Sequence, residues 1–450
     1  MNKKLLLSTI ATSVVLSLGN YTLATEVVNP TPFEAMEYGE LLTGQYATNI
    51  SKPEALLDFD VGHRAATPEQ INNAVRVWAK ESKNIKLVEY AKSYEGRSLH
   101  YLIISSEKNL NNLDEIKANV QKLANPGKHS KAEIKRIIDN QPATAWMAYS
   151  IHGNESSGAD ASLAFIYHLI ASKDNKVKQQ LDDMVIIIDP MMNPDGRARF
   201  TKKLQEHRGA APNVDRQSRL HSDVWPFGRT NHYYFDLNRD FYFNVNPETI
   251  GRVEGINEWY PQLMIDGHEM QAPDNYLMGP PREPVNPNIA PSKTKWANTF
   301  STNHTAAFDK NGWRYYTGEW FENLYPGYSN YSEYRGSVHI LYEQARTAED
   351  GIRLDSERVR SYKKSVHHQF LSSLTNIETL RQNSKAMYQD FVNDRRKVAS
   401  KSSQYANRSF VILPTENDSR MDAFMEIMHR QGINVYETTK AMKVGKAKSH

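Results

Sequence analysis

Short apolar runs alternate with amphipathic segments along most of the chain, and this pattern predicts an α/β fold. Four apolar runs have the length and composition of strands buried on both faces: 143–149, 184–189, 262–266 and 338–342. Three segments repeat apolar residues at helical spacing: 113–124, 131–138 and 159–171. Strands that alternate with helices form βαβ units, so we expect a mixed, largely parallel twisted sheet flanked by helices.

The first part of this region adds a helix and a hairpin. Thr67 and Pro68 supply a cap residue and a proline for the first turn, which predicts a helix that ends near Glu81. Segments 86–90 and 98–104 predict two strands joined by a short turn. We expect residues 69–375 to form the main domain, preceded by an N-terminal lead over residues 25–68.

The pattern changes towards the C-terminus. Segments 358–374 and 377–398 predict two long helices, and we expect residues 376–408 to connect the main domain to a further unit. Apolar runs at 409–414 and 433–436 flank a helical segment, which predicts a strand–helix–strand unit. Because ~40 residues are too few for an independent domain, we interpret 409–450 as a partial, truncated α/β accessory unit.

The N-terminal end predicts export. Residues 1–24 place Lys3 and Lys4 before an apolar run and small residues, which is the layout of a cleaved signal peptide. The run is shorter than the ~20 residues of a membrane span, so we expect no stable membrane insertion. The chain has no cysteine, which excludes disulfides, thiolate metal sites and a cysteine nucleophile. The net charge of +3 predicts no nucleic-acid partner, and we expect a bacterial periplasmic or secreted protein.

Chemistry is concentrated where the predicted strands end. His152 and Glu155 follow the run 143–149, although a lone H-x-x-E pattern is more often a solvated turn than a metal site. His268 follows another predicted strand, and the carboxyl ends of parallel strands share one edge of a sheet. Together the three residues would form a His₂Glu set for one zinc ion. Glu343 follows a third strand and is our candidate general base, although an exposed strand-end glutamate fits the same pattern.

Two polar motifs lie between the candidate ligands. Asn193-Pro194-Asp195-Gly196 predicts only a turn. In the segment 236–240, Arg239 lies among acidic residues. Its planar guanidinium could bind a substrate carboxylate through two hydrogen bonds, but the same sequence would also fit a cluster of structural ion pairs. The chain has neither H-E-x-x-H nor G-x-S-x-G, so the signatures of a thermolysin-like site and of a serine hydrolase are absent.

The order of these motifs resembles that of the zinc carboxypeptidase family, M14. The resemblance covers roughly residues 70–375 and rests on H-x-x-E, N-P-D-G, D-L-N-R, a distant histidine and a late glutamate. It implies a zinc carboxypeptidase-like fold and a metallocarboxypeptidase that hydrolyses C-terminal peptide bonds with a zinc-activated water. It assigns one zinc ion to His152, Glu155 and His268, and the role of general base to Glu343.

The resemblance also implies roles in substrate binding. Asn238 and Arg239 match the pair that binds the terminal carboxylate, so the expected partner is a peptide with a free C-terminus. Arg208 stands where the oxyanion-stabilising arginine is expected. Three other arginines compete for that role: Arg197, Arg199 and Arg216. For the tyrosine that covers the substrate we choose Tyr325, with three further candidates: Tyr328, Tyr331 and Tyr334.

Two alternative functions stay open at this point. One is a zinc amidohydrolase that acts on cell-wall peptides or on peptides with D-residues, which Asn238 and Arg239 would tolerate. The other is a non-catalytic peptide-binding module on the same scaffold, because a fold does not guarantee activity. The presence of Glu343 argues against the module, since a binding protein needs no general base.

Overall fold

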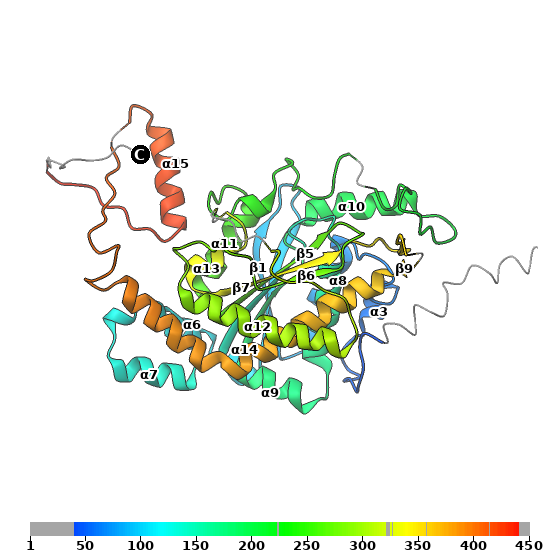
Figure 1. Cartoon of the computed structure of the whole chain (residues 1–450), viewed down its shortest axis with the longest axis horizontal. Helices are drawn as coiled ribbons and strands as arrows, with labels where there is room; N and C mark the ends of the chain where they lie inside the picture. The colour runs from blue at the N-terminus through cyan, green and yellow to red at the C-terminus, as the bar shows by residue number, and fades with distance from the viewer. Residues whose placement is uncertain are drawn as a thin grey trace, which may run out of the picture.

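A seven-stranded mixed sheet forms the centre of the computed structural model (Figure 1). The structure describes residues 40–222, 225–320, 325, 327–356, 358–413 and 415–440. The strands are β1 (Ile85–Lys92), β2 (Ser98–Ile104), β3 (Ala143–Tyr149), β4 (Met184–Asp189), β5 (Leu263–Met270), β6 (Tyr276–Met278) and β7 (Val338–Ala345). Their order across the sheet is β1-β2-β4-β3-β5-β7-β6, and β8 (Ile352–Arg353) pairs with β9 (Val359–Arg360) in a small second sheet.

The pairing confirms the predicted fold class. Strands β4, β3, β5 and β7 run parallel to one another in the centre. Strand β2 pairs antiparallel with both β1 and β4, and β6 pairs antiparallel with β7 at the other edge. The sheet is therefore mixed but mostly parallel, and its parallel strands β3 and β5 position the candidate ligands, with His268 on β5 and His152 and Glu155 in the loop after β3.

Helices cover both faces of the sheet. Those of the main body are α3 (Pro53–Leu57), α4 (Pro68–Glu81), α5 (Glu107–Leu110), α6 (Leu113–Ala124), α7 (Lys131–Asn140), α8 (Ser157–Ala171), α9 (Asn175–Asp183), α10 (Pro194–His207), α11 (Pro247–Trp259), α12 (Pro291–Lys310), α13 (Tyr331–Arg335) and α14 (Tyr362–Val398). Two short 3₁₀ helices are η2 (Pro126–Lys128) and η3 (Leu237–Arg239). Successive strand residues point to opposite faces, so Met147 packs in the core under α4, α8, α12 and α14. Trp146 packs in a second core under α6 and α11.

Local sequence explains where two helices begin. The Thr67 hydroxyl accepts a hydrogen bond from the Gln70 amide, and the Gln70 side chain accepts one from the Thr67 amide, so α4 starts with a complete capping box. The motif N-P-D-G was expected to be a turn, and that prediction is wrong. Asn193 caps α10 by accepting the Gly196 amide at 2.9 Å, and Pro194 occupies the first turn of the helix.

The C-terminal region differs from the expected pattern. One continuous helix, α14, replaces the two predicted helices and runs across the expected boundary at residue 375. In the accessory unit, α15 (Asp418–Arg430) forms as expected, whereas 409–413 and 433–436 are not strands. The unit nevertheless contacts the main body, because the Gln431 side chain donates to the carbonyl oxygens of Phe241 and Tyr242 at 2.9 and 2.8 Å.

The predicted signal peptide, residues 1–24, lies outside the described residues. Within the described part of the chain, no helix combines the length and the apolar character that crossing a membrane requires.

A buried acid on α11 makes stability depend on pH. Glu248 is fully buried, and neither carboxyl oxygen has a hydrogen-bond partner on another described residue. Burial raises its pKa from 4.5 to about 7, and Asp195 and Asp240 act in the same direction. The folded protein therefore keeps a proton that the unfolded chain releases, so the free energy of unfolding falls as the pH rises through this window.

We expect the free energy of unfolding to fall by roughly 2–3 kcal/mol between pH 5 and pH 8 relative to Glu248→Gln, which cannot ionise. Urea unfolding of both proteins across this range measures the difference. The same pH dependence in both proteins would show that Glu248 does not titrate on unfolding.

Candidate metal centre

The first two candidate ligands lie in the loop between β3 and α8. Ser150, directly after β3, has a φ of 58° and turns the chain sharply away from the sheet. The Glu155 amide then donates to the His152 carbonyl oxygen at 3.1 Å, which brings the two side chains to the same side of the loop. Both side chains are buried beside the sheet.

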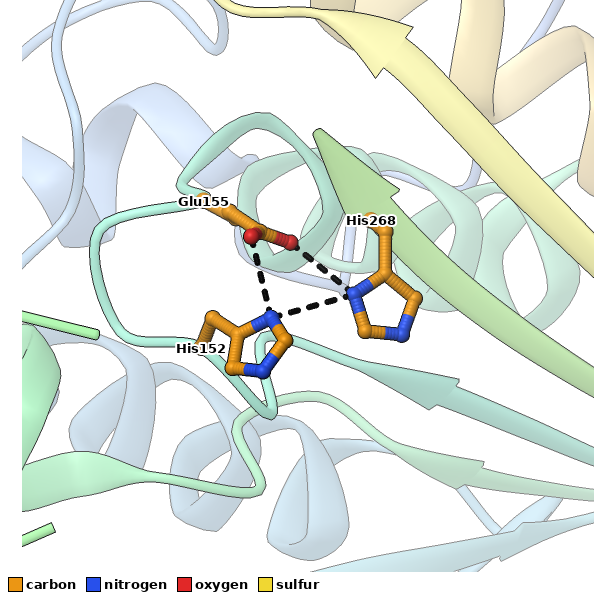
Figure 2. Close-up of side chains that lie close together, drawn as sticks. All are labelled: His152, Glu155 and His268. Carbon is orange, nitrogen blue, oxygen red and sulfur yellow. Dashed lines mark hydrogen bonds and ion pairs between the residues drawn. The ribbon is translucent and has the colours of Figure 1, made fainter. Parts of the chain in front are cut away.

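His268 completes the cluster from β5. Figure 2 shows its imidazole, the His152 imidazole and the Glu155 carboxylate pointing toward one another. His152 Nδ1 lies 2.9 Å from one Glu155 oxygen, and His268 Nδ1 lies 3.0 Å from the other. The two Nδ1 atoms are 3.2 Å apart. One atom from each residue is therefore available to a single ion.

Two carboxylates fix the orientation of the imidazoles. His152 Nε2 lies 3.0 Å from Asp236, and His268 Nε2 lies 2.5 Å from Asp266. A carboxylate only accepts hydrogen bonds, so each Nε2 carries the proton and each Nδ1 presents a lone pair. Two lone pairs and a carboxylate then converge on one point, an arrangement that a cation stabilises. The residues present therefore fit a His₂Glu zinc site with oriented ligands.

The electrostatics of the cluster agree with this assignment. Burial would raise the pKa of Glu155, but the imidazoles of His152 and His268 outweigh it and hold that pKa well below its usual range. Burial would lower the pKa of His268, but Asp266 and Glu155 outweigh it and raise that pKa well above its usual range. The cluster thus favours positive charge at its centre.

Glu343 lies beside the ligands on the neighbouring strand. It is the direct register partner of His268 across the parallel pair β5 and β7. Burial raises its pKa to about 7, an effect that His268 opposes and Glu155 reinforces. Both residues were expected just beyond the ends of their strands. That placement is wrong, because β5 continues to Met270 and β7 to Ala345.

The structure brings Arg229, and not Arg208, to the ligands. Arg229 Nη1 lies 3.3 Å from both His152 Nδ1 and Glu155, and Nη2 donates to Asp236 at 3.0 Å. The Arg208 guanidinium instead binds both oxygens of Glu349, each at 2.9 Å. The expectation for Arg208 is therefore not supported by its contacts.

The three competing arginines also lie in other contacts. Arg197 is fully buried and donates to Asp160 and to the Ala66 carbonyl oxygen. Arg199 donates to the carbonyl oxygens of Phe227 and Asn231. Arg216 pairs with Asp355 at 2.9 Å.

Asn238 and Arg239 lie on η3, next to the ligands. The Asn238 amide group lies 3.2 Å from His268 Nε2, and its oxygen accepts the Ser329 amide at 3.0 Å. The Arg239 guanidinium stacks over the Tyr328 ring at 4.3 Å and remains partly exposed. Tyr325 donates its hydroxyl to the Arg239 carbonyl oxygen at 2.7 Å. Asn238 and Arg239 thus line one side of the centre, with two of the candidate tyrosines against Arg239.

The other two candidate tyrosines have separate contacts. Tyr331 is buried and donates to Asn257 at 3.2 Å. The Tyr334 hydroxyl accepts a hydrogen bond from the Asn286 side chain.

Several residues at the centre were missed from the sequence, among them Asp266, Asp236 and Arg229. Asp266 precedes His268 by two positions on one strand, and this spacing places both side chains on the same face. The spacing of Asp266 and His268 could therefore have indicated from the sequence that Asp266 lies beside this ligand. Asp236 likewise precedes Asn238 by two positions, but its contact with His152 depends on how the loop folds. Arg229 lies in irregular chain, with no periodic pattern to indicate its position.

A family model for zinc carboxypeptidases matches residues 71–278, a range that includes all three candidate ligands. This stretch belongs to the zinc carboxypeptidase family. The protein is accordingly an enzyme whose cofactor is zinc, for which His152, Glu155 and His268 form a suitable cluster. The match ends before β7, so the role of Glu343 remains a prediction.

Several solved structures are similar to this zinc carboxypeptidase. Carboxypeptidase A from Helicoverpa armigera is 17% identical with a TM-score of 0.49, over 75% of this chain and 77% of its own. A metallo-carboxypeptidase from Burkholderia cenocepacia is 13% identical with a TM-score of 0.47, over 70% of this chain and 68% of its own. No curated protein matches the sequence.

Proposed function

We propose that the protein hydrolyses the C-terminal peptide bond of peptides that have a free C-terminus. The observation that carries this proposal is the position of η3, where Asn238 lies 3.2 Å from His268. Arg239 is the next residue, and its guanidinium lies 3.8 Å from Asp236, which contacts His152. A partly exposed guanidinium next to a metal centre can bind a substrate carboxylate while the adjacent peptide bond reaches the centre. The terminal residue is then the one released.

The chain's own residues supply the proton transfers and the charge stabilisation. When bound, zinc polarises the substrate carbonyl and lowers the pKa of a coordinated water. Glu343 accepts a proton from the attacking water and then donates it to the leaving amine. Arg229, which already lies among the ligands, donates hydrogen bonds to the carbonyl oxygen as negative charge develops on it. Asp236 and Asp266 keep the imidazoles oriented throughout.

Selective loss of activity on free C-termini tests the assignment of Arg239. A hydrogen bond between charged groups contributes ~1.5–3 kcal/mol, so Arg239→Ala should lower kcat/KM for free peptides by about 10–100-fold. Amidated peptides should lose much less. Steady-state kinetics on a matched pair of peptides measures both values.

Arg216→Ala is the matched control, because it removes another exposed arginine that pairs with an acid elsewhere. Equal losses on free and amidated peptides in Arg239→Ala would contradict recognition of the carboxylate.

We further propose that the enzyme is exported, on the basis of residues 1–24 and the absence of cysteine. N-terminal sequencing of the mature protein from a bacterial host should start near Thr25. A mature protein that retains Met1 would contradict this proposal.

A further inference from the structure

Five aromatic residues lie on the loop that carries Arg229 and are largely exposed. They are Trp225, Phe227, Tyr233, Tyr234 and Phe235, and we call them the aromatic platform. Trp225 is 63% exposed and Tyr233 is 67% exposed. Three of them contact one another, because Trp225 stacks on Tyr234 with ring centres 4.7 Å apart and meets the edge of Phe227 at 5.7 Å. Tyr233 instead meets the ring of Tyr94 at 4.7 Å. The platform is thus an exposed surface with internal contacts.

Buried polar groups hold the platform in place. The fully buried Asn231 side chain accepts the amides of Tyr233 and Phe235 at 3.1 and 3.0 Å. Between them, Tyr234 has a φ of 60°, a conformation that is uncommon for a bulky residue. Arg199 donates to carbonyl oxygens on both halves of the loop, at Phe227 and Asn231, and its guanidinium lies over the Tyr234 ring. The backbone is therefore locally strained at Tyr234, in a loop conformation that leaves the aromatic rings exposed.

The loop rests directly on the metal centre. A Cβ at Gly153, between the two ligands of the H-G-N-E motif, would lie only 2.6 Å from the Gly228 carbonyl oxygen. A Cβ at Gly196 would lie 2.5 Å from the same oxygen. Side chains are therefore excluded where this loop packs against the loop of His152 and the start of α10. Arg229 follows Gly228 and reaches the ligands, so the platform is continuous with the centre.

The platform suits an apolar partner. Exposed apolar side chains that gather on one loop, rather than lying scattered singly, point to a binding surface. A sugar would need hydrogen-bond partners around its hydroxyls, whereas the described polar side chains of the loop are used elsewhere. Asn231 and Arg199 bind the loop backbone, and His232 pairs with Glu95 at 3.2 Å. The surface that remains consists mainly of aromatic rings.

We propose that the aromatic platform binds apolar side chains of the peptide upstream of the bond that is cleaved. This inference rests on the proposed function. A peptide with its carboxylate on Arg239 and its last carbonyl at Arg229 would reach the platform by continuing away from Arg239 along the segment that carries Arg229. The preferred substrates are then peptides with aromatic or large aliphatic residues before the scissile bond.

Upstream preference can be measured with N-acetylated pentapeptides that share their last two residues. One peptide carries glycine at the three upstream positions, and three others carry a single phenylalanine there. Aromatic contacts of ~0.5–1.5 kcal/mol predict that the best phenylalanine peptide exceeds the glycine peptide by about 3–10-fold in kcat/KM. In Trp225→Ala and Tyr234→Asn this ratio should fall towards one, and asparagine at position 234 still tolerates the positive φ.

Phe410→Ser is the matched control, because Phe410 is 86% exposed and lies outside the main body. It should keep the wild-type ratio. Equal rates for all four peptides in the wild type, or an unchanged ratio in both platform variants, would overturn the platform while leaving the exopeptidase proposal intact. Absence of terminal-residue release from every peptide would overturn both.

Discussion

Glu343→Gln should lower kcat by about 10²–10⁴-fold while the protein still binds zinc, because the variant loses only its proton acceptor. Glu343 faces the centre from β7 as the register partner of His268, but it does not belong to the ligand cluster. Glutamine has nearly the same shape and cannot take a proton from water. Kinetics on one peptide, together with metal analysis of the purified variant, separates the two effects.

Glu254→Gln is the control for this substitution, since Glu254 is exposed on α11. It should retain both activity and zinc. A Glu343→Gln enzyme that keeps wild-type activity would exclude Glu343 as the general base, and one that loses zinc would make it a ligand.

Arg229→Ala should lower kcat by about 10²–10³-fold, which is the usual cost of removing one donor to a developing oxyanion. Arg208→Ala should change kcat little, because the Arg208 guanidinium binds both oxygens of Glu349. The two variants compare the arginine that the structure places at the ligands with the one that motif order had favoured. A larger loss in Arg208→Ala than in Arg229→Ala would reverse the assignment.

Zinc content matters for the interpretation of Arg229→Ala as well. The side chain also contacts Asp236, which orients His152, so the variant should be loaded with zinc before assay. A rate restored by excess zinc would mean that Arg229 acts through the metal ligands and not on the substrate.

Strands with continuous apolar sequence were predictable to the residue. β3 and β4 are buried on both faces, so their sequences differ sharply from the flanking polar chain. β5 and β7 extend further than expected because their last residues are functional and polar, among them His268 and Glu343. The sequence pattern therefore located the candidate ligands. The polar residues at the ends of β5 and β7 made these two strands appear shorter in the sequence than they are in the structure.

The single helix α14 shows a second limit. The sequence predicted two helices, 358–374 and 377–398, which left Thr375 and Asn376 between them. In the structure the Thr375 hydroxyl donates to the Leu371 carbonyl oxygen, and the Asn376 side chain donates to the Tyr342 hydroxyl at 2.7 Å. Polar residues with buried partners can continue a helix, and only tertiary structure identifies those partners.

The ligands could be identified from sequence because several motifs, each weak alone, occur together in the order of the zinc carboxypeptidase family. Arg229 could not, because several arginines follow N-P-D-G and their positions depend on how irregular chain folds. The choice of Tyr325 as the covering tyrosine stays a prediction, although its contact with Arg239 places it at the expected side of the centre.

One peptide offered in two forms, with a free and an amidated C-terminus, would test the metal centre and the substrate contacts together. The zinc-loaded enzyme should remove a single terminal residue from the free form and act far more slowly on the amidated form, as read by mass. Chelation should abolish this activity, and added zinc should restore it. Internal cleavage, equal release from both forms, or full turnover after chelation would contradict a zinc carboxypeptidase that recognises the C-terminus through Arg239.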